Sequence, residues 1–267
     1  MSPSSLTGRY LAAQAIALEA GGLARRFLRD PAGLRVEAKG PQDFVTAADR
    51  AVEDLIAQRL CAAFPDDALL GEEGHAIAAD AEDEALWVVD PIDGTANFVR
   101  DLPDWCVSIG LMYRGRPELG VIYVPVTNEL YTAQRGQGAL CNGRPIGVSA
   151  QTTIAGATIG LDYSFSTPSA KHRAHIEAIH ANGGEYRRNG SVAVSLTSVA
   201  SGRLDGFVEL ELNAWDVLAG IVLVQEAGGW TNDFLAADGL RNGNPMIAAT
   251  PGIRDQLLAI TGLESWH

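Results

Sequence analysis

Hydrophobic residues at helical spacing dominate the first quarter of the chain. A continuous alanine-rich stretch predicts a helix over about residues 6–28, and a second helix is predicted from near Thr46. The second helix has one buried face, because its apolar residues recur at positions i, i+3 and i+4. These residues are Val52, Leu55, Ile56, Leu60 and Ala63. Pro65 ends this helix, since proline has no N–H to donate and its ring clashes with the preceding turn.

Two short apolar runs then predict buried strands. The run at 68–70 leads into Gly71, Glu72 and Glu73, and the run at 86–89 leads into Asp90. Each of these strands therefore delivers carboxylates at its C-terminal end.

The pattern changes to β-rich segments between residues 105 and 147. Three segments at 107–113, 119–124 and 129–133 are separated by turn signals, which predicts an antiparallel meander. Gly136 and Gly138 could suggest a nucleotide-binding glycine loop. The motif is incomplete and lies between strands rather than at the start of a helix, so that interpretation is rejected.

After residue 149 strands and helices alternate again. The pattern predicts strands at 157–161, 204–212 and 246–249, and helices at 171–180, 190–200, 215–227 and from about 253. The chain is thus of the α/β class with mixed sheets. A weak candidate boundary at 149–153 divides it into an N-terminal α+β part, residues 1–150, and a C-terminal α/β part, residues 151–267.

Composition narrows the function classes. The 267 residues suffice for one large domain or two fused ones, and the formal charge of −13 argues against a general nucleic-acid binder. A phosphate ligand stays possible, because bound cations can reverse the local charge. Three scattered cysteines are too few for a disulfide framework, and no apolar run is long enough to span a membrane. We expect a soluble, cytoplasmic protein with buried thiols.

The segment 87–98 is the most informative one chemically. A hydrophobic strand ends at Asp90, Pro91 blocks its extension, and Gly94 permits a sharp turn before a short helix. Asp90 and Asp93 can converge on one point, where their like charges require a cation or a shared proton. Mg²⁺ prefers such oxygen ligands, and amide groups at the start of the helix suit a phosphate. The simpler alternative is a solvated turn with two surface aspartates.

Four segments together resemble the inositol monophosphatase family of Mg²⁺-dependent phosphatases. Asp-Pro-Ile-Asp-Gly-Thr at 90–95 is similar to the signature of that family, and 43–49 is similar to its early Asp/Thr segment. Gly-Glu-Glu at 71–73 resembles a third family element. Trp-Asp-Val-Leu-Ala-Gly at 215–220, followed by Glu-Ala-Gly-Gly at 226–229, resembles the C-terminal signature. The four segments stand in the family's order and spacing.

The resemblance implies a fold, a metal centre and a mechanism. The fold is a layered α/β/α/β/α sandwich with mixed sheets, with most metal ligands in residues 1–150. Two to three Mg²⁺ ions are implied, held by the side chains of Glu72, Asp90, Asp93 and Asp216 and by the carbonyl of Ile92. The implied catalytic residues are Asp49 and Thr95, which hold and polarise the attacking water, and Glu72, which lies near a third, weaker ion.

The resemblance also implies substrate contacts. The implied residues are Asp93, Gly94, Thr95, Gly190, Ser191 and Glu209. The family often has a small Thr-Ala pair where this chain has Ser191 and the bulkier Val192. Glu209 stands seven positions before Asp216, and an exposed strand residue without a ligand is an equally acceptable interpretation of it.

The expected function is Mg²⁺-dependent hydrolysis of a small polyol phosphate, with inositol 1-phosphate as the first candidate. Alternative substrates on the same fold are histidinol phosphate, fructose 1,6-bisphosphate and 3′-phosphoadenosine nucleotides. A different class of function is a non-catalytic, partner-binding role in transcription or ribosome assembly. By resemblance, the partners are the small phosphomonoester and a second copy in a homodimer, with no nucleic acid and no membrane.

Several other polar or aromatic residues have simpler interpretations. Asp66 and Asp67, and the acidic run at 82–84, are expected to be solvated loop charges. His172 and His175 share a helix face but are expected on an exposed helix with no third metal ligand. The bulky aromatic residues Trp87, Phe98 and Trp105 are expected in the core.

Overall fold

The computed structural model describes residues 5–29, 36–40, 43–74, 76–77, 84–164 and 167–263. Its larger sheet has eight strands in the order β10-β9-β8-β7-β6-β5-β3-β4. These strands are β3 (Ala68–Gly71), β4 (Ala76–Ile77), β5 (Ala85–Asp93), β6 (Cys106–Tyr113), β7 (Arg116–Val124), β8 (Glu129–Gln134), β9 (Ala139–Cys141) and β10 (Arg144–Pro145). Strands β5 to β10 pair antiparallel in sequence order, so the predicted meander is confirmed.

A parallel pair within this sheet brings two acidic segments together. Strand β3 runs parallel to β5, with Gly71 opposite Val89. The amide of Glu72 donates a hydrogen bond to the Val89 carbonyl at 3.2 Å. Because parallel strands end at the same edge, Glu72 and Asp90 emerge side by side.

The smaller sheet has five strands in the order β12-β11-β13-β15-β14. These are β11 (Thr158–Leu161), β12 (Glu185–Arg187), β13 (Gly206–Leu212), β14 (Trp230–Thr231) and β15 (Asn244–Ala249). Strand β11 is parallel to β12 and β13, whereas β15 is antiparallel to β13 and β14. A separate hairpin pairs β1 (Val36–Gly40) with β2 (Asp43–Thr46).

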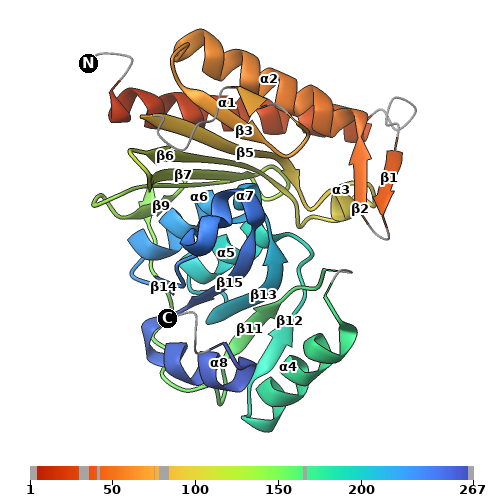
Figure 1. The fold of residues 1–267 in the computed structure, drawn as a ribbon, viewed down its shortest axis with the longest axis vertical. Coiled ribbons are helices and arrows are strands. Elements are labelled where there is room, and N and C mark those ends of the chain that lie inside the picture. Colours follow the sequence, from red (N-terminus) through yellow and green to blue (C-terminus); the bar gives the residue numbers. More distant parts are fainter. Residues whose placement is uncertain are drawn as a thin grey trace.

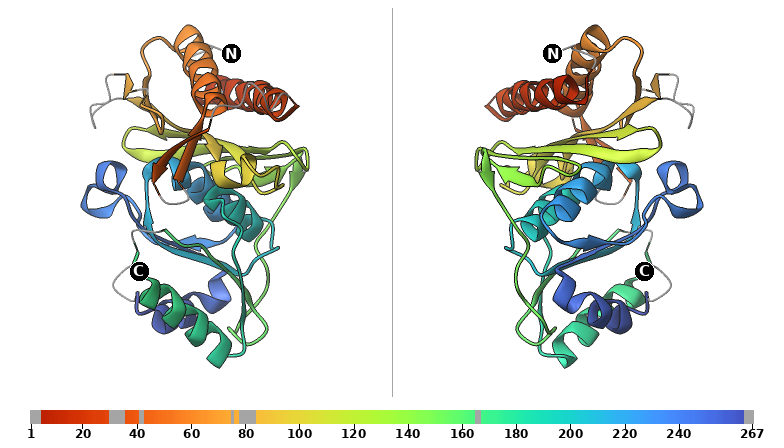
Figure 2. Two further views of the ribbon diagram at one scale, coloured as in Figure 1. Left: turned by 90° about the vertical axis from the view of Figure 1, so that its right-hand side faces the viewer. Right: turned by 90° about the vertical axis from the view of Figure 1, so that its left-hand side faces the viewer.

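Helices cover both sheets and complete a five-layer sandwich (Figures 1 and 2). Helices α1 and α2 lie on the outer face of the large sheet, α5 and α6 lie between the sheets, and α4 and α8 cover the outer face of the small sheet. The helices are α1 (Leu6–Arg29), α2 (Ala47–Ala63), α3 (Thr95–Phe98), α4 (Ser169–Ala181), α5 (Val192–Ala200), α6 (Ala214–Glu226), α7 (Gly239–Asn242) and α8 (Arg254–Thr261), with 3₁₀ turns Ala236–Asp238 and Pro251–Ile253. The predicted α/β/α/β/α sandwich is confirmed.

The buried apolar residues follow these layers. One cluster joins α1 and α2 to the large sheet and contains Trp87, Phe98 and Trp105, as expected. A second cluster surrounds α5 and α6 between the sheets, and a third joins the small sheet to α4 and α8. No helix in the described part of the chain is long and apolar enough to cross a membrane.

Two glycines let α6 approach the large sheet closely. Gly110 and Gly120 are paired across β6 and β7. A Cβ at Gly120 would lie 2.2 Å from the Ala219 carbonyl oxygen, and one at Gly110 would lie 3.1 Å from the Ala219 amide nitrogen. The absence of both side chains therefore sets how near the first turn of α6, with Asp216, comes to the end of β5.

The candidate boundary at 149–153 lies in the connection between the two sheets. Ser149 Oγ donates to Asp205 Oδ1 at 2.5 Å, and the Thr158 amide donates to Asp205 Oδ2 at 2.7 Å. Helix α6 comes from the second part of the chain yet packs on the sheet of the first part. The division into residues 1–150 and 151–267 stays a prediction.

Some local expectations were wrong. Asp67 is not a solvated loop charge: it is buried and forms an ion pair with Arg9 at 2.5 Å, and the Trp87 indole donates to it at 2.9 Å. Helix α4 is not simply exposed, because it packs against α8 and His175 is buried. Glu84 is exposed as expected, whereas Glu82 and Asp83 lie outside the described residues.

The ends of two elements also differ from prediction. The helix expected from residue 190 begins at Val192, because Ser191 is its N-cap, and the strand expected from 204 begins at Gly206. Of the three free thiols, that of Cys106 is buried, whereas Cys61 and Cys141 are half-buried.

The glycine turn after β8 has a structural role. The amides of Gly136, Gln137 and Gly138 donate to the carboxylate of Glu226 at 2.8–3.1 Å. These N–H groups thus bind an internal carboxylate, which agrees with the rejection of a nucleotide loop. The contact anchors the C-terminal end of α6 to the large sheet.

Candidate active site

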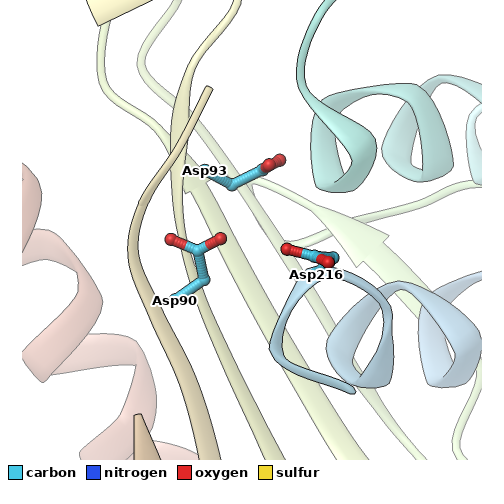
Figure 3. A group of neighbouring side chains, drawn as sticks. All are labelled: Asp90, Asp93 and Asp216. Carbon is cyan, nitrogen blue, oxygen red and sulfur yellow. The ribbon is translucent and has the colours of Figure 1, made fainter. Parts of the chain in front are cut away.

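Three carboxylates converge at the edge of the large sheet (Figure 3). Asp90, Asp93 and Asp216 each place an oxygen within 4.8 Å of the other two. Asp90 and Asp93 come from the end of β5, and Asp216 comes from the first turn of α6. Residues far apart in sequence therefore meet where the two sheets face each other.

The end of β5 is shaped to present two carboxylates. The β5–β6 register shifts between Asp90 and Asp93, so the strand is irregular over Pro91 and Ile92. The Ile92 amide donates to Asp90 Oδ1 at 3.0 Å. Gly94 then adopts φ +92°, a left-handed conformation that glycine accepts at little cost. The chain turns into α3 and leaves both carboxylates on one side.

Asp216 is positioned by its helix. It is the third residue of α6, and its Oδ2 accepts the Asn213 amide at 2.7 Å in a capping box. An acidic residue in the first turn interacts favourably with the helix dipole. One oxygen is thus used by the helix cap, and the carboxylate is held toward the other two aspartates.

Asp93 is held in place by the N-terminus of helix α5. Ser191 Oγ donates to Asp93 Oδ2 at 2.5 Å, and the Ala193 amide donates to the same oxygen at 2.7 Å. Ser191 is also the N-cap of α5. The N-terminal amides of α5 therefore face the Asp93 carboxylate. A helix N-terminus favours a negative charge at this position.

Asp49 and Thr95 form a separate pair beside the cluster. Asp49 Oδ2 accepts the amide and the hydroxyl of Thr46, at 2.8 and 2.6 Å, at the start of α2. Thr95 Oγ1 lies 3.0 Å from Asp49 Oδ1 and 3.0 Å from the Ile92 carbonyl oxygen. One hydroxyl proton serves both acceptors, so the oxygen of Thr95 can in turn accept a hydrogen bond from a ligand.

The environment of the cluster disfavours the ionised form of its own aspartates. Burial, and then the charges of Glu72 and Asp93, raises the pKa of Asp90 well above its usual value. The pKa of Asp216 is raised well above its usual value by burial and then by Asp93 and Glu72. Burial also raises the pKa of Asp93 and of Asp49. Close like charges in a buried site favour either protons or a bound cation.

The residues present fit a divalent cation. A cleft of about 180 Å³ is lined by the three aspartates together with Phe44, Glu72, Ile92, Gly94, Thr95, Ala96 and Gly190. Its donor set consists of carboxylate, carbonyl and hydroxyl oxygens, which are the ligands that Mg²⁺ takes in proteins. Neutralisation by such an ion removes the repulsion among the aspartates. The structure thus brings Glu72, Asp90, Ile92, Asp93 and Asp216 to one cleft.

The sequence-predicted substrate residues divide into two groups. Gly94, Thr95 and Gly190 line the same cleft as the aspartates, and Ser191 contacts Asp93 directly. Glu209 lines a second, smaller cavity instead. Its side chain is buried, so the interpretation as an exposed strand residue is wrong.

Two residues near the cleft were not predicted as site residues. Asn97 Nδ2 donates to the carbonyls of Asp104 at 2.6 Å and Asn189 at 2.8 Å, so it joins α3 to the segment before α5. Asp162 Oδ1 accepts the Gly190 amide at 2.9 Å. Burial raises the pKa of Asp162 to about 6. The sequence did contain a signal for Asp162, because this residue directly follows a predicted strand, as Asp90 does.

Comparisons with known proteins agree with this geometry. The model of the inositol monophosphatase family matches residues 7–260. An inositol-1-monophosphatase of Rhizobium meliloti is 40% identical over 243 residues, covering 89% of this chain and 87% of the relative. A Nus factor SuhB of Xylella fastidiosa is 38% identical, covering 84% of this chain and 82% of the relative. The crystal structure of the suhB protein of Bartonella henselae superposes with a TM-score of 0.87 at 35% identity, covering 94% of this chain and 96% of that one.

Proposed function

This chain belongs to the inositol monophosphatase family, and from that premise we propose that it is an Mg²⁺-dependent phosphomonoesterase acting on a small polyol phosphate, with inositol 1-phosphate as the first candidate. One observation supports this most directly. The three aspartates converge in a cleft that Thr95 also lines, and the Thr95 hydroxyl oxygen can accept a hydrogen bond from a ligand. A phosphate needs cations to enter a site this acidic, and the cluster is built to hold them.

Divalent cations at the aspartates, two to three in our proposal, would neutralise the charge that develops on the phosphate and lower the pKa of the attacking water. The chain's own residues do the rest. Asp49 and Thr95 hold and polarise the water through the Thr95 hydroxyl, while Thr46 fixes the second oxygen of Asp49. Burial raises the pKa of Asp49, which suits a group that shares the proton of the water.

The phosphate is oriented by the turn after β5. Gly94 and Thr95 lie at the start of α3, where amides are not used by the helix itself. A Cβ at Gly94 would lie 2.8 Å from the Asp104 carbonyl oxygen, so only glycine fits this approach without displacement of the backbone. Gly190 also lines the cleft, and Ser191 contacts Asp93. In our proposal both residues contact the polyol, and Glu209 hydrogen-bonds one of its hydroxyls.

The experiment is phosphate release in Mg²⁺ buffer from a panel of esters. The panel contains inositol 1-phosphate, fructose 1,6-bisphosphate, histidinol phosphate and a 3′-phosphoadenosine nucleotide. We expect inositol 1-phosphate to have the highest kcat/KM, and Asp93→Asn to abolish turnover of every ester. If another ester is preferred, the phosphatase stands and its substrate changes. If no ester releases phosphate above the Asp93→Asn background, the enzymatic proposal is wrong.

A second candidate function rests on the names of relatives. Several proteins 35–38% identical to this chain are Nus factors SuhB. A partner-binding role in transcription or ribosome assembly is therefore the alternative. A pull-down with the Asp93→Asn variant tests it, because a partner retained by an inactive protein indicates binding independent of catalysis. Capture of the same background proteins as an unrelated bait counts against it.

The oligomeric state is also proposed from the family resemblance. We expect a homodimer with no affinity for nucleic acid. Light scattering after size-exclusion chromatography measures the mass directly, and a monomer at micromolar concentration contradicts the proposal.

A further inference from the structure

Glu53 is a buried acidic residue that the proposed mechanism does not use. It lies on α2, four positions after Asp49, and only 1% of its surface is exposed. Residues four positions apart share one face of a helix. The face of α2 that presents Asp49 to Thr95 therefore also presents Glu53 to β3 of the large sheet.

The Glu53 carboxyl group contacts the turn that carries Glu72. Its Oε2 accepts the Glu73 amide at 2.9 Å. A Cβ at Gly71 would lie 2.6 Å from Cδ and Oε2 of Glu53 and 2.9 Å from Oε1, so the carboxyl group occupies the space that a side chain at Gly71 would need. Both neighbours of Glu72 along the chain are thus in contact with one side chain.

Glu72 itself is bonded to the strand on its other side. Its amide donates to the Val89 carbonyl of β5, and its side chain lines the cleft of the three aspartates. The parallel ladder of β3 and β5 ends at Gly71, directly before Glu72. The turn is therefore held by β5 at Glu72 and by α2 at Glu73.

We propose that Glu53 is a positioning residue for the metal ligand Glu72. The inference rests on the metal centre of the proposed function, in which Glu72 is a ligand. Groups that hydrogen-bond around a metal site commonly orient its ligands, and their removal weakens metal binding. Without the Glu53 carboxyl group, the Glu73 amide loses its acceptor and the space beside Gly71 is empty. The turn then keeps its bond to β5 but loses its support from α2.

Helix α2 supports two parts of the proposed active site in this arrangement. Asp49 bonds the Thr95 hydroxyl, and Glu53 bonds the turn that carries Glu72. Successive turns of one helix are about 5.4 Å apart and move together. The helix therefore fixes the pair that holds the attacking water relative to one of the metal ligands.

Binding of Mn²⁺ alone tests the proposal without any substrate. Free Mn²⁺ has a sharp EPR spectrum that broadens on binding, so a titration gives the Kd. Glu53→Ala should raise the Kd by about 10–100-fold, as expected when a group that orients a metal ligand is removed. Glu53→Gln keeps an oxygen that can accept the Glu73 amide, and it should recover most of the affinity.

A double-variant cycle shows whether Glu53 acts through Glu72. Glu72→Gln should itself weaken Mn²⁺ binding. Adding Glu53→Ala to it should cause little further loss, because the ligand that Glu53 positions is already altered. Additive losses would overturn the proposal, since they would give Glu53 a general structural role. Asp54→Ala is the matched control, because Asp54 is the exposed neighbour on the same helix and should keep the parent Kd.

Gly71→Ala tests the same contact from β3. The added Cβ would displace the Glu53 carboxyl group, so this variant should also raise the Kd for Mn²⁺. It keeps the test decisive if Glu53→Ala does not fold. An unchanged Kd in Gly71→Ala would contradict the proposal.

The parent protein separates this inference from the proposed function. If the parent binds no Mn²⁺, the metal centre and the role of Glu53 are both wrong. If the parent binds Mn²⁺ and Glu53→Ala binds it equally well, only the role of Glu53 is wrong.

Discussion

Ser191 Oγ lies 2.5 Å from Asp93 Oδ2, although 98 positions separate the two residues. Asp93 ends a strand of the large sheet, and Ser191 starts the helix α5 that lies between the sheets. The same Asp93 oxygen accepts the Ala193 amide. A proposed metal ligand is therefore oriented by a helix N-terminus from the other half of the chain.

Ser191→Ala should weaken both stability and activity. The variant loses the hydrogen bond to Asp93 and the N-cap bond from the Val194 amide, which lies 3.3 Å from Ser191 Oγ. Loss of a serine N-cap lowers the free energy of unfolding by about 1 kcal/mol. A misoriented Asp93 should also lower kcat/KM by at least about tenfold. Denaturant unfolding and phosphate release measure the two effects.

Ser198→Ala is the control for this variant. The Ser198 hydroxyl also lies in α5, but it bonds only the Val194 carbonyl of its own helix. Its replacement should leave activity unchanged and alter the free energy of unfolding by less than about 0.5 kcal/mol. Equal losses in both serine variants would mean that α5 packing, and not the contact with Asp93, explains the result.

Thr95→Val should lower kcat by about 100-fold or more while the Tm changes little. Valine has the shape of threonine but lacks the hydroxyl that links Asp49 to the cleft. Thr95→Ser retains that hydroxyl and should recover most of the rate. Steady-state kinetics with both variants give kcat and KM separately. Full turnover by Thr95→Val would remove Thr95 from the proposed mechanism.

The stability of the metal-free protein should fall as the pH rises. Asp90, Asp93 and Asp216 have raised pKa values in the folded protein, whereas an unfolded chain has ordinary values near about 3.9. Between the ordinary and the raised values the folded state binds more protons than the unfolded state. Stability is then lost with increasing pH through that interval. Tm measured against pH in a chelator should show this slope, and saturating Mg²⁺ should reduce it.

Asp216→Asn should raise the Tm of the metal-free protein and diminish its response to Mg²⁺. The substitution removes one of the mutually repelling charges and also one proposed ligand. Asp255→Asn is the matched control, because Asp255 is exposed and pairs with its neighbour Arg254. A Tm that falls in Asp216→Asn without metal would show that charge repulsion does not dominate the cluster.

Asp67→Asn should lower the free energy of unfolding by about 3–5 kcal/mol, because it removes the buried carboxylate charge that pairs with Arg9. Glu19→Gln breaks an exposed pair with Arg59 and should change stability by less than about 1 kcal/mol. Denaturant midpoints at constant m-value compare the two. Similar small losses in both would mean that the Arg9–Asp67 pair is effectively solvated.

Local patterns in the sequence were enough for the elements and for part of the acidic motif. The β-rich segments and turn signals at 107–133 predict the meander, because strand propensity and turn residues are local features. The order strand, Asp90, Pro91, Asp93, Gly94 predicts the turn that brings two carboxylates together. These features depend on neighbours a few residues away, which the sequence displays directly.

Burial of charge was harder to predict from sequence. Asp67 follows a helix and looks like a loop charge, yet Arg9, 58 positions earlier, enters the core beside it. Glu209 and Asp162 were likewise placed around one cavity by the packing of β11, β13 and α4. Such contacts depend on how the helices and sheets of the fold stack. Neither residue of a contact stands out in the sequence of its own segment.

The sequence by itself determined the α/β class, most of the helices and strands, and the acidic turn at the end of β5, because helix periodicity, strand alternation and turn chemistry are local. Only the tertiary structure decided that Asp216 and Ser191 meet Asp93, and that Glu209 is buried beside a small cavity. The physical reason is the stacking of α5 and α6 between two sheets. That stacking requires close packing at Gly110 and Gly120, and it brings together groups whose separation along the chain is large.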